Sequence, residues 1–182
     1  MIKKIIFLSF LLFFISNCGK DSGFVYSNEQ EFVEQVIKCA NEYNNIMGYE
    51  NSIPLPIVVG QASLESGYGT SRFAEQGNNL FGIKEFNTDK PYIVSLDNSK
   101  IKLRKYKNKC DSVKDYMHML NTSKLYHHFR FEIITQDLSN NQDLNKLINT
   151  LNIYAEDEEY GQKLINTINF LLWLIVSFKD IF

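Results

Sequence analysis

Glu65 is the residue whose type and setting best fit acid chemistry. It follows the mostly apolar run Ile57–Leu64 and precedes Ser66-Gly67-Tyr68-Gly69, within the longer stretch Gln61–Phe86. Burial against apolar or aromatic groups raises the pKa of a carboxyl group and keeps it protonated near neutral pH. Such an acid protonates the leaving oxygen when a glycosidic bond breaks. A purely structural role is less natural, because a carboxylate at the C-terminal end of a helix opposes the helix dipole.

The other titratable clusters predict neither a cofactor nor a metal site. The sequence has no Cys-x-x-Cys or paired histidine spacing typical of zinc sites. His118, His127 and His128 lie beside aromatic residues without a nucleophile to pair with, so we assign them to packing or to the surface. The acidic run Glu156–Glu159 is interpreted as the start of a helix. The basic run Lys100–Lys109 fits either attraction to anionic polymers or a solvated strand edge.

Helical spacing of apolar residues accounts for most of the elements that must position Glu65. A capping box at Ser27–Gln30 opens the first helix, and Pro56 opens the helix that ends at Gly67. Further helices are predicted from Ser112, over Lys124–Gln136, from Asp143 and from Asp157. Alternation in Tyr92–Leu96 and Ile101–Tyr106, joined by turn residues, predicts a β-hairpin. The fold class is therefore α+β, mostly helical, on a lysozyme-like plan with a small β-hairpin.

Length and composition favour one packed domain. The chain has 182 residues, of which 45% are hydrophobic, which is too short for two ordinary domains. The net charge of −2 shows no basic surplus, which argues against a nucleic-acid partner. An aromatic content of 14% suits a polysaccharide ligand, because sugars stack on flat faces. We expect a monomer.

Residues 1–18 predict an export signal with a lipid anchor. Lys3 and Lys4 precede the apolar run Ile5–Ile15, which is too short for a permanent membrane span. Cys18 follows where a bacterial lipoprotein signal places its lipidated cysteine, although Asn17 replaces the usual Gly or Ala. An ordinary secretory signal is the alternative, and both export the chain. Residues 19–26 then form a tether, and residues 27–182 form the domain.

Two further features leave alternatives open. Cys39 and Cys110 either pair in an oxidising compartment or remain buried free thiols, and we favour free thiols because spacing does not show that they meet. The apolar run Phe170–Phe178 is too short to span a membrane, so we favour a helix buried in the core. A face resting on the membrane near the anchor is the other interpretation.

Three ordered blocks resemble the glucosaminidase family, glycoside hydrolase family 73. The first is QASLESGYGTSRFAEQGNNLFGIK, which begins at Gln61. The second, Leu103–Arg130, resembles the Bax-like branch, and the third is Tyr154-Ala155-Glu156-Asp157 followed by Tyr160. Together the blocks cover about residues 55–168.

The resemblance implies a role for individual residues. Glu65 is the implied general acid, and Tyr154 is implied to orient or stabilise the reacting centre. The implied substrate-binding residues are Ser66, Tyr68, Asn78, Asn79, Phe81 and Asp157. Tyr68 stands where the family usually has Trp, so we expect weaker stacking.

The second catalytic group has no matching motif. Glu85, Asp89 and Asp97 are candidates by location only. Two alternatives are favoured and left open: attack by the N-acetyl group of the substrate, which needs one protein carboxylate, or attack by a water that an aspartate positions.

The implied function is an endo-β-N-acetylglucosaminidase that cleaves peptidoglycan glycan strands. A muramidase or lytic transglycosylase on the same fold, and a non-catalytic wall-binding lipoprotein, are the alternatives. The expected location is the cell envelope, with a lipid anchor in the periplasm or outer membrane.

Overall fold

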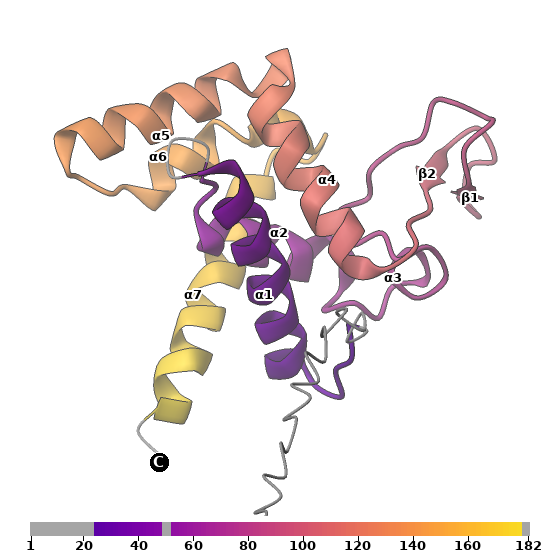
Figure 1. The fold of residues 1–182 in the computed structure, drawn as a ribbon, viewed down its shortest axis with the longest axis horizontal. Helices are drawn as coiled ribbons and strands as arrows, with labels where there is room; N and C mark the ends of the chain where they lie inside the picture. The colour runs from indigo at the N-terminus through magenta and orange to yellow at the C-terminus, as the bar shows by residue number, and fades with distance from the viewer. Residues whose placement is uncertain (1–23, 49–51, 180–182) are drawn as a thin grey trace, which may run out of the picture.

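The computed structural model describes residues 24–48 and 52–179, with side chains to residue 174. The predicted signal, lipidated Cys18 and most of the tether lie outside these residues. Helices dominate, and one short antiparallel hairpin is the only sheet among the described residues (Figure 1). The elements are α1 Glu29–Met47, α2 Leu55–Ser66, α3 Arg72–Gly77, β1 Tyr92–Val94, β2 Lys102–Arg104, α4 Lys109–Thr122, η2 Lys124–Tyr126, α5 His127–Ser139, α6 Leu144–Asn149, η3 Asn152–Tyr154 and α7 Tyr160–Lys179. The predicted mostly helical α+β class is confirmed.

The buried core lies among α1, α2, α4 and α7. The α2 helix packs against both α1 and α7, and α1 also packs against α4. At Gly60, α2 and α7 pack so closely that a Cβ would collide with the side chain of Ile168. The α2 helix ends at Gly67, which adopts a left-handed conformation with φ 56°.

The hairpin forms a separate lobe beside α3 and α4 (Figure 1). It pairs Ile93 with Leu103, and an isolated bridge from Lys84 to Leu103 extends the pairing. The predicted hairpin is confirmed, with strands shorter than the alternation suggested.

Two helices, α1 and α4, start at other residues than predicted because asparagines cap them. Asn28, not Ser27, caps α1 by accepting from the Glu31 N–H at 2.9 Å. The predicted start at Ser112 is also wrong, because Asn108 caps α4 through the Asp111 N–H at 2.8 Å. Asp143 does cap α6 as predicted, by accepting from the Lys146 N–H.

The favoured free thiols are wrong, because Cys39 and Cys110 form a disulfide. Their Cα atoms lie 5.3 Å apart, and the bond joins α1 to the start of α4 across 71 residues of sequence. Sequence spacing alone carries no signal for such a long-range contact.

The C-terminal run is buried only in part. Leu171 faces the core, but Phe170, Leu172 and Trp173 are 42%, 46% and 62% exposed. The prediction of a helix buried in the core is therefore wrong at these three residues. No helix among the described residues is both long enough and apolar enough to cross a membrane.

Candidate active site

A cleft of about 490 Å³ opens between the helical body and the hairpin lobe. It brings together three residues predicted from the sequence, Glu65, Phe81 and Tyr154. The full lining is Glu65, Phe81, Gly82, Ile83, Lys84, Phe86, Arg104, Asp115, Met119, Leu125, Tyr126 and Tyr154. The cleft therefore combines a carboxyl group with aromatic and apolar surface, which is the lining expected for a ligand site.

Glu65 occupies the last turn of α2 and is partly buried. Burial raises the pKa of its carboxyl group, while a hydrogen bond with Tyr160 lowers it in part. Opposite lies Gly82, where a Cβ would come only 4.0 Å from Glu65 Oε2. The glycine, with φ 65°, keeps the space beside this carboxyl group open for a substrate.

A chain of buried hydrogen bonds holds Glu65 from behind. The Tyr116 hydroxyl donates to Gln61 Oε1, and Gln61 Nε2 donates to the Tyr160 hydroxyl at 2.6 Å. Because the Tyr160 oxygen already accepts this bond, its own hydrogen is free to point at Glu65, with which it is hydrogen-bonded. Burial raises the pKa of both tyrosines, so both remain neutral donors. Neither Gln61 nor Tyr160 was among the site residues predicted from the sequence.

Tyr154 lines the cleft but already has an acceptor. Its hydroxyl donates to the backbone carbonyl of Phe81 at 2.5 Å. The Phe81 ring in turn stacks on Tyr116, with centroids 4.0 Å apart and planes 3° apart. These contacts fix the backbone that leads into Gly82, next to Glu65.

A second carboxylate in the cleft, Asp115 of α4, was missed. Its Oδ2 accepts from Arg104 at 2.6 Å and from the Tyr106 hydroxyl at 2.6 Å. Arg104 also binds the buried Glu85 at 2.9 Å. Although burial acts to raise the pKa of Glu85, the Asn87 N–H and the charge of Arg104 lower it overall. The available signal was the place of Asp115 directly before Tyr116, in the second family block.

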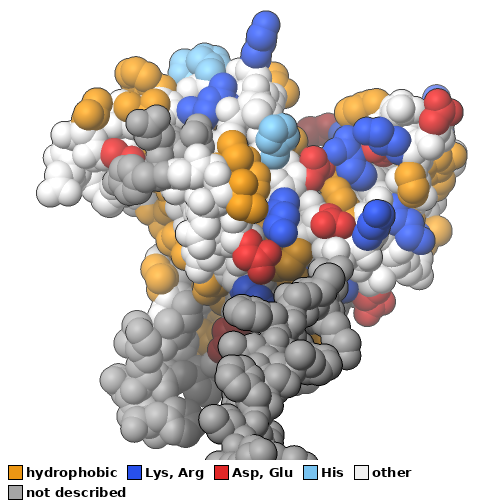
Figure 2. Space-filling view, in the orientation of Figure 1, with side chains coloured by type: hydrophobic (Ala, Val, Ile, Leu, Met, Phe, Trp, Pro, Cys, Tyr) orange, Lys and Arg blue, Asp and Glu red, His pale blue; other side chains and the backbone are white. Residues whose placement is uncertain are grey.

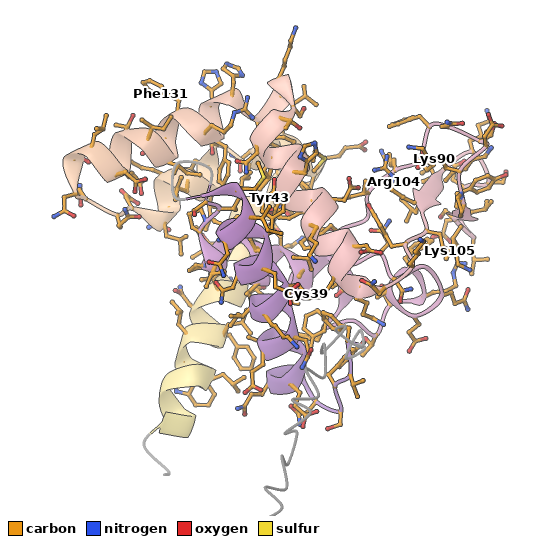
Figure 3. The ribbon with its side chains drawn as sticks, in the orientation of Figure 1. Cys39, Tyr43, Lys90, Arg104, Lys105 and Phe131 are labelled. Carbon is orange, nitrogen blue, oxygen red and sulfur yellow. A yellow bond between two sulfur atoms is a disulfide. The ribbon has the colours of Figure 1, made fainter. Side chains whose placement is uncertain are left out.

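The three carboxylates proposed by location do not line the cleft. Glu85 is 5% exposed and held by Arg104, while Asp89 and Asp97 are exposed on the hairpin lobe. Figure 3 shows Arg104 on the same lobe as Lys90 and Lys105.

Ser66 and Tyr68, which follow Glu65, stabilise the turn that ends α2. The buried Ser66 Oγ donates to the Ala62 carbonyl and accepts from the Gly69 N–H at 2.7 Å. Tyr68 has a left-handed φ of 54°, and its ring packs edge-on against Phe32 of α1. Neither side chain lines the cleft.

Three other predicted substrate contacts also have structural partners. Asn78 and Asn79 bind backbone carbonyls of the hairpin lobe, including those of Tyr106 and Arg104. Asp157 forms an exposed ion pair with Lys163 at 2.5 Å, outside the cleft. Substrate binding by Ser66, Tyr68 and these three residues stays a prediction.

No group of His, Cys, Asp and Glu in the described part of the chain is arranged to hold a metal ion.

Comparison with solved structures gives matches over most of the chain. The glycoside hydrolase domain of Salmonella typhimurium FlgJ has a TM-score of 0.60 and 21% identity, and the alignment covers 85% of this chain and 94% of that one. A peptidoglycan hydrolase from Sphingomonas sp. A1 has a TM-score of 0.59 and 25% identity over 77% of this chain and 87% of that one. The catalytic domain of the Listeria monocytogenes autolysin Auto has a TM-score of 0.57 and 22% identity over 80% and 86%.

Comparison with curated protein sequences gave no match. The family model described as mannosyl-glycoprotein endo-beta-N-acetylglucosaminidase matches residues 40–171, which include every residue lining the cleft. The Bax-like branch stays a prediction. The chain belongs to the Glucosaminidase family and is a glycoside hydrolase with a lysozyme-like fold.

Proposed function

We propose that this enzyme hydrolyses the glycan strand of peptidoglycan as an endo-β-N-acetylglucosaminidase, with Glu65 as general acid. One observation carries the proposal: a partly buried carboxyl group with a raised pKa faces the cleft across Gly82. A protonated Glu65 delivers its proton to the glycosidic oxygen as the bond to the sugar carbon breaks. The Sphingomonas match, described as a peptidoglycan hydrolase, supports this substrate class.

Two routes complete the reaction. In the first, the N-acetyl group of the substrate attacks the sugar carbon, and water later opens the resulting ring. In the second, an aspartate positions the attacking water. Asp115 is the aspartate that lines the cleft, and Arg104 and Tyr106 fix its carboxylate. We propose that Tyr154 acts on the reacting centre through the backbone of Phe81, which its hydroxyl holds in place.

The decisive experiment is a digest of purified sacculi followed by borohydride reduction and mass spectrometry. Wild type, Glu65→Gln and Tyr154→Phe are compared. We expect reduced N-acetylglucosamine ends from wild type, none from Glu65→Gln, and fewer from Tyr154→Phe. Reduced muramic acid ends would identify a muramidase, and anhydro-muramic ends a lytic transglycosylase. Binding to sacculi without any new ends would identify a wall-binding protein.

We propose a cell-envelope location, with Cys18 as the lipidated residue of an anchor. Peptidoglycan lies in the same compartment, which supports this location. Metabolic labelling with a palmitate analogue tests the anchor, and Cys18→Ala should abolish the label.

A further inference from the structure

The exposed face of α7 changes from polar to apolar at residue 170. Up to that point, its solvent-facing side chains are Gln162, Lys163, Asn166 and Asn169. From there they are Phe170, Leu172 and Trp173, and the rings of Phe170 and Trp173 stack with centroids 6.0 Å apart. Exposed apolar side chains that gather on one face of a helix are typical of an interaction site, so we expect a partner for this apolar end.

The described part of the chain does not cover this apolar end. The α7 helix packs against α2 and α6, and its last turns extend beyond them at the lower end of Figure 1. The core contact continues to Leu171, so the helix is held by one face while the opposite face stays exposed.

The predicted lipid anchor, Cys18, lies only a few residues before the first described residue. The N-terminal end of α1 lies at the same lower end of the molecule (Figure 1). Phe24, the first described residue, packs against Tyr26 and Phe32 beside it. Six residue steps separate Phe24 from Cys18, and an extended chain of that length spans about 20 Å. A lipidated Cys18 would therefore keep the domain within reach of a bilayer.

We propose that the apolar end of α7, Phe170 to Trp173, lies in the interfacial region of the membrane that anchors the chain. Tryptophan and phenylalanine are favoured at the level of the lipid headgroups, where an apolar ring is buried and polar groups stay wet. A single lipid anchor would leave the domain free to rotate, and this second contact fixes its orientation. The strand β2 and helix α4, which line the cleft, lie at the upper right of Figure 1, away from the membrane side.

Apolar burial, and not charge, drives the contact. Glu29 and Glu31, in the first turn of α1, lie at the same end of the molecule and would repel anionic headgroups. The contact should therefore form on zwitterionic vesicles and persist at high salt.

Trp173 is the only tryptophan of the chain and reports on its own environment. The full-length protein is incorporated into phosphatidylcholine vesicles by its N-terminal segment, and tryptophan emission is recorded. We expect a shift to shorter wavelength, quenching by acyl chains carrying bromine, and loss of quenching by iodide. Leu172→Glu should restore iodide quenching, because a charge opposes insertion of this face. Leu138→Glu, on the exposed face of α5, is the matched control and should change nothing.

A relocated reporter gives the second control. In Trp173→Phe combined with Phe131→Trp, the tryptophan lies on α5, at the opposite end of the molecule (Figure 3). We expect iodide to quench it fully on vesicles. The proposal is overturned if Trp173 remains open to iodide on vesicles, if the chain does not bind vesicles, or if Trp173 is protected in a lipid-free dimer. Hydrolysis of soluble glycan fragments by Leu172→Glu reports separately on the proposed function.

Discussion

Two opposing effects act on the pKa of the Glu65 carboxyl group. Burial raises the pKa of its carboxyl group, and the hydrogen bond from Tyr160 lowers it. The side chains that face it are Tyr160 from α7, Tyr116 from α4 and Tyr154 from η3, and burial raises the pKa of all three. All three stay neutral at ordinary pH, so burial and one hydrogen bond set the protonation of the acid.

Tyr160→Phe should move the alkaline limb of the pH–rate profile to higher pH. A general acid works while it is protonated, so activity falls as the pH rises through its pKa. Removing the hydroxyl removes the effect that lowers the pKa of Glu65, and the limb moves up. The maximal rate should fall, because the carboxyl group also loses its orientation. The measurement is kcat/KM on soluble glycan fragments across pH.

Tyr116→Phe tests the rest of the hydrogen-bond chain. Without the Tyr116 hydroxyl, the Gln61 amide is free to turn, so the limb should move in the same direction by a smaller amount. Tyr43→Phe, in the core face of α1, removes a hydroxyl elsewhere and should leave the limb in place. If the alkaline limb of the pH–rate profile did not move in Tyr160→Phe, the role of Tyr160 in lowering the pKa of Glu65 would be contradicted.

Residue roles were predictable where the chemistry lies in one short segment. Glu65 was identified because its apolar helix and glycine turn are contiguous in sequence. Tyr68 was expected in the cleft, but its left-handed backbone turns the ring towards Phe32. Asp115 was missed because Arg104 and Tyr106, which hold it, come from the hairpin lobe and not from α4. No local pattern reports such a contact.

At the scale of elements, the α2–α7 contact positions the part of the hydrogen-bond chain that joins Gln61, Tyr160 and Glu65. Gln61 and Glu65 lie on α2, and Tyr160 opens α7. Gly60 permits this close packing, since Leu164 and Ile168 of α7 occupy the space where a Cβ would stand.

Gly60→Ala should therefore destabilise the fold although it lies inside a helix. Alanine is favoured over glycine in helices by about 1 kcal/mol, but overpacking a core costs about 1 to 3 kcal/mol. We expect a net loss of unfolding free energy, measured by urea denaturation. Gly161→Ala is the control, because a Cβ there meets only Asn152 Oδ1 at 3.2 Å and Ile148 at 3.7 Å. An equal loss in both variants would contradict the packing argument.

The disulfide joins two further elements, α1 and α4. It closes a loop across 71 residues, and the entropy of closing such a loop corresponds to about 4 kcal/mol of stability. Cys39→Ala combined with Cys110→Ala should lower the unfolding free energy by up to that amount. A reductant should lower the melting temperature of wild type and leave the double variant unchanged. Equal sensitivity of both proteins would show that the bond contributes nothing.

Element types were predictable, and their ends were less so. Apolar spacing identified the main helices and the hairpin, because periodicity follows directly from which face is buried. The starts of α1 and α4 were misplaced because several polar residues near each start can cap a helix. The structure selects Asn28 and Asn108, whose side chains reach the N–H groups of Glu31 and Asp111.

At the scale of the whole molecule, positive charge is concentrated in the hairpin lobe. Residues 84–108 contain seven Lys or Arg and three Asp or Glu, a net of +4 in a chain whose total is −2. Figure 2 shows lysine and arginine side chains gathered on that lobe. Arg104 is engaged by two carboxylates, but exposed Lys90, Lys100 and Lys105 form no salt bridge with any described residue.

Peptidoglycan with free stem-peptide carboxylates is an anionic polymer, so this lobe should strengthen its binding. Changing Lys90, Lys100 and Lys105 to Gln should weaken binding to sacculi on the order of tenfold at low salt. The difference should shrink near physiological salt, where screening acts within about 8 Å. Turnover of short uncharged glycan fragments should not change, because none of the three lysines lines the cleft. A sedimentation assay with sacculi measures the binding.

The matched control separates local charge from net charge. Changing Lys114, Lys146 and Lys163 to Gln removes the same number of charges from the helical body, where two of the three are already paired with glutamate or aspartate. If total charge governed adsorption, both triple variants would lose binding equally. A loss confined to the lobe variant would mean that the positive face beside the cleft holds the anionic strand. The lysines of the hairpin lobe would then bind the anionic strand beside Glu65 without taking part in the cleavage reaction.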